Sequence, residues 1–479
     1  MQGNLATSRS VWVIGFWIIG LLAIATRFWG LGRFPLVVFD EVYYSTMATQ
    51  YLAGTPFIDR HPPTARFIFA ALAKFAGANP NARFETTVMP YGDFPYRVLR
   101  MGSATAGVLV IVFIMLIGKE LTHMPLVGLI AGLLAVFDNA LTLFSRYILG
   151  DIFISCFGLA GLWCYLKKNQ APAQGTAWYT WLTLAGVSFG LSVGTKITGG
   201  LFLATAWFIC YVQDKPSQRL PDRTAVLFLA GIPAVIVVVL MTAHFLLLDA
   251  HGPVLNVIGN ADPRLHTSAI FEAIRNSHFI HQFGATGVVI QRVIEIIVGT
   301  LLTVGGHTGK FHALAPTSPS WAWPFLERPI PWVIIPHEHT VQVIHFIGNP
   351  AIWWGGLIAL IYLLIKRLRH SEYKVADPLL FGYSLNLATL SLPLRQVFLY
   401  LYLPSLLFLI LITATVLARL YQFRPKTVGT LVALAILTFI FFMPFTYGFP
   451  LTEEQIQRRA WLPDWNPLLH DNSENPRVP

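Results

Sequence analysis

The sequence predicts an all-α polytopic membrane protein of about eleven transmembrane helices with two long external loops. Of its 479 residues, 55% are hydrophobic and only 12% are charged, whereas a soluble protein carries about 25% charged residues. Apolar segments recur at lengths that cross a bilayer, and basic residues gather in alternate connecting loops. We therefore predict one transmembrane domain over residues 1–479.

The predicted spans begin near the amino terminus, where an apolar segment at 11–29 follows Arg9. Ala23-Ile24-Ala25 resembles a signal-peptide cleavage site, but the segment is longer than the apolar region of a usual signal peptide, so we keep it as a span. The other spans are predicted at 96–118, 126–144, 151–166, 178–193, 197–212, 226–248, 343–365, 378–392, 397–417 and 428–445.

The positive charge of the chain has a topological explanation. The net charge is +10, and Lys and Arg collect in loops that would lie in the cytoplasm, so we expect no nucleic-acid partner. This pattern predicts a multi-pass protein of the plasma membrane with a cytoplasmic amino terminus. The loops at 30–95 and 249–342 would be external, as would the tail at 451–479. No internal repeat indicates paired transporter halves.

Two adjacent acids mark the start of the first external loop. Asp40 and Glu41 stand just beyond the first apolar segment, and carboxylates near a bilayer face are often functional. Alternatively, Asp40 caps a helix at 42–52 that ends at Gly54, with Glu41 favoured by the helix dipole. The catalytic and capping roles are compatible, and the residues alone do not separate them.

A second short helix is predicted after His61-Pro62-Pro63, because proline suits the first helical turn. Its apolar residues would lie along the membrane surface, with Arg66 and Lys74 on the side that faces water. These apolar residues are Phe67, Ile68, Leu72 and Phe75.

An ordered set of short motifs extends along nearly the whole chain. The set comprises Phe39-Asp-Glu41, His61-Pro-Pro63, Arg100 with Ser103, Ala104 and Gly107, Asp138-Asn139, Ser145-Arg146-Tyr-Ile-Leu149, Asp151, Gly194-Thr-Lys196, His307-Thr-Gly309, Trp321-Ala-Trp-Pro324, Arg328-Pro329, Gly348-Asn-Pro-Ala-Ile-Trp-Trp354, Leu392-Pro393, Arg395 and Tyr400-Leu-Tyr-Leu-Pro404. In this set the chain resembles the protein O-mannosyltransferases, membrane glycosyltransferases of the GT-C class that use dolichyl- or polyprenyl-phosphate-mannose.

Two positions depart from that family. Arg66 stands where the family usually has Lys, and Leu401 stands where it has His between two tyrosines. The first change keeps the charge, whereas the second removes a polar group near the expected site. The chain also shows no appended sugar-binding module of the eukaryotic kind, so we expect a prokaryotic-type member.

The resemblance implies a GT-C-like bundle whose external loops carry interfacial helices. It also implies transfer of mannose from a polyprenyl-phosphate-mannose donor to Ser or Thr of exported proteins, by single displacement with inversion. Such a step needs a carboxylate to take the hydroxyl proton and cations to stabilise the departing phosphate. By the resemblance Asp40 is the base, and Glu41 orients either Asp40 or the acceptor. No cofactor is expected, and the further partners would be membrane lipids and the protein-export machinery.

Three cations are candidates for the donor phosphate, because a cation near a membrane face is costly when unpaired: Arg100, Arg146 and Lys196. Alternatively, these cations extend to the interface or pair with Asp138 or Asp151. The candidate substrate-binding residues are His61, Arg66, His307, Trp323 and Arg395.

Other motifs carry less weight. His337-Glu338-His339 has no third ligand at a defined spacing, so we expect no metal. The segment at 305–310 lacks the first Gly and the Ser/Thr of a phosphate-binding P-loop. The three cysteines lie inside apolar segments and are interpreted as packing residues: Cys156, Cys164 and Cys210.

Two other functions stay open at this point. One is a GT-C enzyme that moves another sugar, such as aminoarabinose, onto a lipid or glycan. The other is a transporter or channel, whose ionisable residues would be expected near the bilayer midplane.

Overall fold

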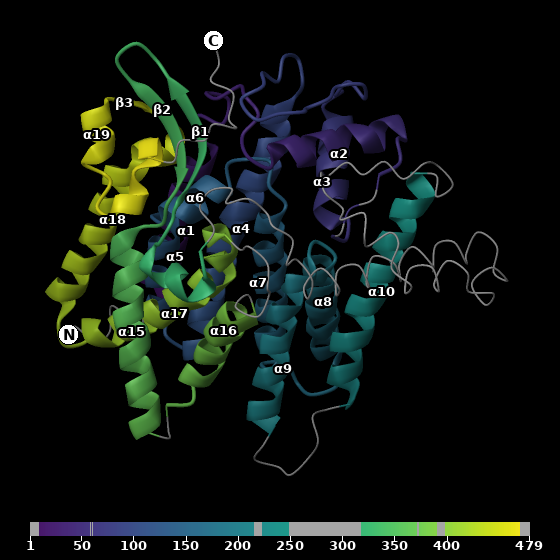
Figure 1. Ribbon diagram of the computed structural model, residues 1–479. Helices are drawn as coiled ribbons and strands as arrows, with labels where there is room; N and C mark the ends of the chain where they lie inside the picture. Colours follow the sequence, from purple (N-terminus) through teal and green to yellow (C-terminus); the bar gives the residue numbers. More distant parts are fainter. Residues whose placement is uncertain are drawn as a thin grey trace.

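The computed structural model describes residues 9–57, 59, 61–214, 223–248, 318–370, 373–389 and 398–469. Figure 1 shows a bundle of long helices whose upper end carries short helices and a small sheet. The bundle contains α1 (Arg9–Phe28), α4 (Tyr96–Thr122), α5 (Pro125–Val136), α7 (Asp151–Lys168), α8 (Thr176–Val193), α9 (Gly200–Asp214), α10 (Arg223–Leu247), α15 (Pro350–Arg369), α16 (Ala376–Thr389), α17 (Leu403–Tyr421) and α18 (Pro425–Tyr447). The shorter elements are α2 (Glu41–Ala53), α3 (Thr64–Phe75), α6 (Asn139–Phe144), α19 (Glu453–Gln457), η1 (Ile197–Gly199), η3 (Ser320–Phe325), η4 (Leu399–Tyr402), β1 (Ile330–Pro336), β2 (Val341–Phe346) and β3 (Pro450–Leu451).

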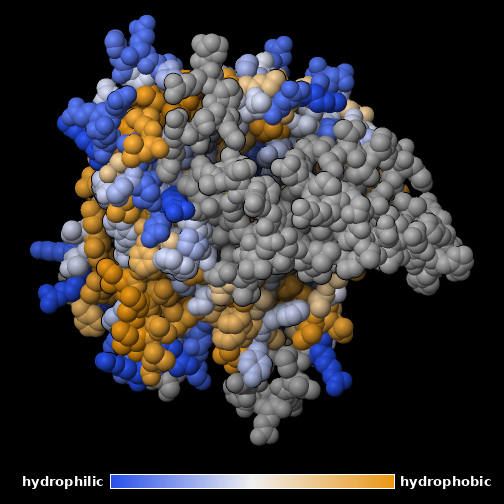
Figure 2. Space-filling model, in the orientation of Figure 1, coloured by the Kyte–Doolittle hydropathy of each residue, from blue (hydrophilic) through white to orange (hydrophobic). Residues whose placement is uncertain are grey.

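The helices confirm the prediction of a mostly helical, multi-pass membrane protein. Among the described residues, six helices are long and apolar enough to cross a membrane, namely α1, α4, α10, α15, α17 extended by η4, and α18. Each predicted span contains a helix, but several, such as α16 with 14 residues, are too short to meet that criterion. Figure 2 shows hydrophobic residues gathered over the side of the bundle, between hydrophilic residues at its upper and lower margins.

The predicted span at 343–365 is wrong at its start. Residues Val341–Phe346 form strand β2, and helix α15 begins only at Pro350. The Asn349 side chain accepts a hydrogen bond from the backbone N of Ala351 at 3.1 Å, and Pro350 stands at the first helical position. Strand β2 pairs antiparallel with β1 and β3, so the all-α prediction missed a small sheet.

The predicted span at 126–144 is broken into α5 and α6. Asp138 caps α6 by accepting a hydrogen bond from the backbone N of Leu141 at 2.8 Å. The same carboxylate accepts from Trp353 Nε1 at 2.8 Å and from the backbone N of Asn349 at 3.2 Å. Asp138 is fully buried, so it stops one helix and joins α6 to the start of α15.

The described part of the tail packs against the same end of the bundle as the sheet. Trp465 is fully buried, and its Nε1 donates to the carbonyl of Leu326 at 2.8 Å. All three cysteines are buried and none is in a disulfide, which confirms their interpretation as packing residues.

Candidate active site

The helix predicted after the acid pair is confirmed, but Asp40 does not cap it through its side chain. Helix α2 covers Glu41–Ala53 and ends at Gly54, whose φ of 66° is the left-handed conformation that glycine adopts easily. Asp40 occupies the N-cap position with φ −68° and ψ 0°, and its carboxylate makes no capping hydrogen bond. The geometry therefore does not support capping by Asp40, and the carboxylate is left for other contacts.

Glu41 is an anchor inside the protein. Its two oxygens accept hydrogen bonds from Arg100, from Nε at 2.8 Å and from Nη2 at 2.7 Å. They also accept from the backbone N of Val38 and of Ile148, both at 2.9 Å. The Glu41 side chain is fully buried, so these four bonds fix α2 to α4 and to the segment before α7.

The remaining N–H groups of Arg100 donate hydrogen bonds to the loop that precedes Asp40. Its Nη1 donates to the carbonyls of Leu31 and Phe34 at 3.1 and 2.7 Å, and Nη2 donates to that of Leu36 at 3.0 Å. A guanidinium has five N–H donors, and here all five have an acceptor. Arg100 is also buried, so the geometry favours a positioning role over the phosphate contact expected from the sequence.

Phe39, the residue directly before Asp40, has a constrained backbone conformation. Its φ of 51° is unusual for a residue with a side chain. Its ring stacks on Trp332, with centroids 4.8 Å apart and planes 2° apart, and meets the edge of Tyr400 at 5.7 Å. Asp40 is thus held between a stacked aromatic residue and the anchored Glu41.

The Asp40 carboxylate is partly buried and has no partner among the described residues. Within the described ranges, its side chain has no hydrogen bond or ion pair. Burial raises the pKa of Asp40 to about 7, nearby Asp151 raises the pKa further, and Lys196 opposes both effects. A carboxylate with a pKa near 7 suits a general base at neutral pH.

Asp151 and Lys196 form an ion pair beside Asp40. Lys196 Nζ lies 2.8 Å from Asp151 Oδ1, and the two side chains are 13% and 19% exposed. Lys196 therefore pairs with Asp151, as the alternative interpretation of the sequence predicted, but both side chains stay partly accessible. A cavity of about 30 Å³, which would hold about one water, lies against Asp151 and is also lined by Tyr400 and Leu401.

Close backbone contacts bring these elements together. The backbone N of Thr64, at the start of α3, donates to the carbonyl of Gly194 at 2.9 Å. A Cβ at Gly194 would collide with Thr64 Oγ1, and one at Gly150 would collide with the Tyr44 ring. Gly194 therefore lets the turn before Lys196 approach α3, and Gly150 lets the start of α7 approach α2.

Arg66 is buried, so the prediction that it faces water is wrong. It forms an ion pair with the buried Asp59, and its Nη1 donates to the carbonyls of His61 and Pro62 at 3.0 and 2.7 Å. Lys74 of the same helix is exposed, as expected. Arg66 therefore holds the turn at His61 in place, which favours a positioning role over direct substrate contact.

Arg146 lies apart from the Asp151 ion pair. Its Nη1 donates to three carbonyls at the end of α1, those of Thr26, Arg27 and Trp29, at 3.2, 3.0 and 2.7 Å. The guanidinium also lies over the Tyr447 ring at 4.3 Å. It is buried between α1 and α18 and is not an electrostatic neighbour of Asp40. Of the three predicted phosphate ligands, only Lys196 lies beside Asp40.

Trp323 is fully buried, which leaves no ring face for a substrate. Its Nε1 donates to Ser318 Oγ at 3.0 Å, because a buried indole N–H needs an acceptor. The exposed tryptophan of this segment is Trp321, at 65%. His307 and Arg395 lie outside the described residues. In the part of the chain that the structure describes, no group of three acidic, His or Cys side chains is placed to hold a metal.

Comparisons with known proteins identify the family of the chain. Residues 17–249 match the family described as dolichyl-phosphate-mannose-protein mannosyltransferase, and residues 305–465 match the C-terminal four-transmembrane region of protein O-mannosyltransferases. The chain belongs to the protein O-mannosyltransferase family. The two matches together include the Asp40 loop, α7 and the sheet.

Two similar proteins show how much of the chain is matched. Dolichyl-phosphate-mannose--protein mannosyltransferase 4 of Schizosaccharomyces pombe is 31% identical over 45% of this chain and 29% of its own length. Mannosyltransferase 1 of Candida albicans is 25% identical over 70% of this chain and 39% of its own length. The matched segments thus span less than half of either relative.

The fold is also that of a solved family member. The structure of the Saccharomyces cerevisiae Pmt1-Pmt2 complex bound to the sugar donor has a TM-score of 0.78 at 18% identity. That match covers 95% of this chain and 92% of the other.

The sequence analysis identified Asp151 as a motif residue and as a possible partner of a cation, but not as a candidate site residue. The structure makes Asp151 an electrostatic neighbour of both Asp40 and Tyr44, and it lines the cavity. One feature of the sequence did indicate a role for Asp151: it stands at the start of an apolar segment, and an acid in that position lies at a membrane face. Its proximity to Asp40 depends on how α2 packs on α7, which local sequence does not reveal.

Proposed function

We propose that this chain transfers mannose from polyprenyl-phosphate-mannose to Ser or Thr hydroxyls of exported proteins. The observation that carries the proposal is the position of Asp40, a partly buried carboxylate with a pKa raised to about 7, next to the partly exposed ion pair of Lys196 and Asp151. Membership of the protein O-mannosyltransferase family supports the donor and the acceptor.

The reaction that these groups support is a single displacement. The acceptor hydroxyl attacks the anomeric carbon while the bond from that carbon to the phosphate oxygen breaks, which inverts the configuration. Asp40 takes the hydroxyl proton, and the polyprenyl phosphate leaves with the electron pair of the broken bond. Lys196, held by Asp151, stabilises the charge that grows on the phosphate. Glu41 and Arg100 position Asp40 through their buried contacts.

A transfer assay tests the proposed function. The full chain in detergent is given one Ser/Thr peptide together with polyprenyl-phosphate-mannose, -glucose or -aminoarabinose, each in a separate reaction. We expect sugar on the peptide from the mannose donor and little from the others. Transfer of aminoarabinose, or mannose on a lipid with none on peptide, would contradict the proposal.

Replacing Lys196 by Ala should weaken use of the lipid donor more than use of the peptide. A hydrogen bond to a charged group contributes about 1.5 to 3 kcal/mol, so we expect the KM for the donor to rise by about tenfold or more. The KM for the peptide should change little. The matched control is Lys74→Ala, which removes an exposed lysine from helix α3. Equal donor KM in Lys196→Ala and the wild type would remove Lys196 from the donor site.

We also propose an orientation in the plasma membrane. The active site and the carboxyl terminus lie outside and the amino terminus lies in the cytoplasm, because basic loops favour the cytoplasm. A carboxy-terminal alkaline phosphatase, which is active only outside, should therefore be active in cells. A fusion after Lys168, at the basic end of α7, should be inactive. The reverse pattern, with both fusions present at full length, would overturn this orientation.

A further inference from the structure

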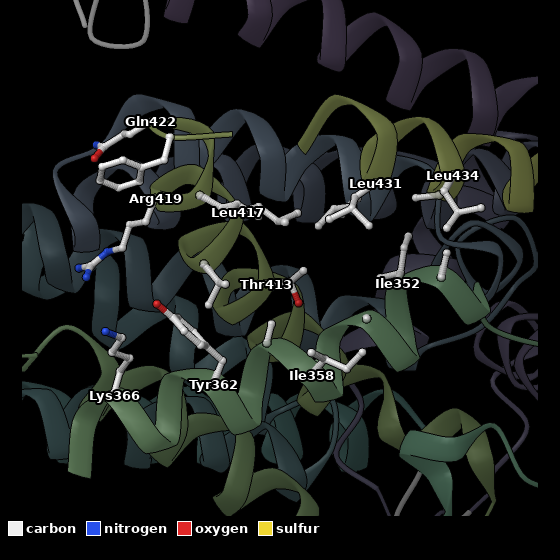
Figure 3. Close-up of a pocket in the computed structure, with 18 of the residues that line it drawn as sticks. Ile352, Ile358, Tyr362, Lys366, Thr413, Leu417, Arg419, Gln422, Leu431 and Leu434 are labelled. Atoms are coloured by element: carbon white, nitrogen blue, oxygen red, sulfur yellow. The ribbon is translucent and has the colours of Figure 1, made fainter. Parts of the chain in front are cut away.

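A long groove lies between three helices on the side of the bundle. It has a volume of about 880 Å³ and is enclosed by α15, α17 and α18 (Figure 3). Its walls are mostly aliphatic, and several lining residues are exposed on the surface that would face lipid, with Ile358 at 72% and Leu434 at 51%. Pockets of several hundred Å³ with apolar walls are typical of sites for small ligands.

One end of the groove is basic. Figure 3 shows the side chains of Lys366 and Arg419 at the same end, where Gln422 and the Tyr362 hydroxyl add polar groups. Both cations are partly buried, and none of the described residues that line the groove is acidic. The acid on the neighbouring helix, Asp377, already pairs with Arg367. Among the described residues, no acid therefore neutralises the basic end.

The length of the groove matches one leaflet of a membrane. Ile352 and Lys366 lie at its two ends on α15, and 14 residues of helix rise about 21 Å. Half of a bilayer with its headgroup region is about 20 to 22 Å thick, so an acyl chain whose phosphate lies at the basic end would reach about to the midplane. The basic end falls at the carboxyl ends of α15 and α17, away from the sheet that flanks Asp40 (Figure 1).

We propose that this groove binds one anionic phospholipid, with its phosphate at Arg419 and Lys366 and an acyl chain along α15. Charge complementarity selects an anionic headgroup, because the groove supplies two cations and no described acid. The orientation follows from the same positions, since positive residues and anionic lipids both favour the cytoplasmic leaflet. This site is distinct from the Asp40 site and does not depend on the proposed transfer activity.

Two variants separate the headgroup contact from the chain contact. Lys366→Gln combined with Arg419→Gln removes the charge but keeps most of the side-chain length. Gly355→Leu fills the apolar part, and apart from the backbone of its own helix no atom lies within 4 Å of a Cβ at Gly355, so the first added carbon has room. Its matched control is Gly231→Leu, an equally open helical position on α10, outside the groove.

The full chain and its variants are reconstituted in nanodiscs of equal phosphatidylglycerol and phosphatidylcholine, and retained lipid is counted by native mass spectrometry. We expect the wild type and Gly231→Leu to retain one phosphatidylglycerol in preference to phosphatidylcholine by tenfold or more. The double Gln variant should lose that preference, since each cation near an anionic lipid contributes about fivefold in affinity. Gly355→Leu should retain neither lipid.

Three outcomes would overturn the proposal. The first is equal retention of the two lipids by the wild type, and the second is an unchanged preference in the double Gln variant. The third is displacement of phosphatidylglycerol by equimolar undecaprenyl phosphate, which would assign the groove to a polyprenyl lipid. Because the readout is bound lipid, a failure here leaves the mannose transfer assay unaffected.

Discussion

Asp40→Asn is expected to slow mannose transfer by about 10²- to 10⁴-fold, the usual contribution of a general base. Asn has nearly the shape of Asp but cannot accept the proton, and Asp40 makes no capping hydrogen bond that the change would remove. Folding should therefore be unaffected. The measurement is the single-turnover rate at saturating donor and peptide, with thermal unfolding in detergent as the test of folding.

The matched control for this variant is Asp93→Asn, which changes an exposed acid of the same loop and should leave the rate unchanged. A stable Asp40→Asn enzyme that transfers mannose at nearly the wild-type rate would remove Asp40 as the base. Asp151, the other accessible acid beside it, would then be the next candidate.

Replacing Arg100 by Met is expected to destabilise the protein strongly. The change leaves Glu41 as a buried charge without its partner, and breaking a buried pair in this way costs about 3 to 5 kcal/mol. It also leaves the carbonyls of Leu31, Phe34 and Leu36 without a donor. The free energy of unfolding in detergent, measured with a denaturant, should fall by that amount.

Arg97→Met is the matched control, because Arg97 is on the same helix one turn earlier and is exposed. We expect it to change the free energy of unfolding by less than about 0.5 kcal/mol. If Arg100→Met were as stable as the wild type but bound the lipid donor poorly, Arg100 would be a phosphate ligand and the positioning role would be wrong.

The helical part of the fold could be predicted because its signal is local. Long apolar segments specify spanning helices, and Gly54 indicated the end of the helix that follows the acid pair. The sheet was missed since the apolar residues of β2 continue into those of α15 almost without a break. The boundary depends on Asn349 and Pro350, whose capping geometry is local but easily hidden in an apolar run.

The candidate site could be predicted only in part, because residue type does not reveal which partner the fold brings to a side chain. Arg100 and Arg66 have the charge that a phosphate ligand needs, but the first is paired with Glu41, 59 positions away, and the second with Asp59. Lys196 also has a partner, yet its ion pair with Asp151 stays accessible. Burial, rather than charge, therefore separates the positioning cations from the candidate ligand.

The pH dependence of transfer tests the role of Asp40 most directly. Asp40 acts as a base only when it is deprotonated, and its pKa is raised to about 7. We expect the single-turnover rate of the wild type to rise with pH, to reach half of its maximum near pH 7 and then to level off. The residual rate of Asp40→Asn should lack this rise. A wild-type rate that does not change around pH 7, or an identical rise in Asp40→Asn, would contradict general-base catalysis by Asp40.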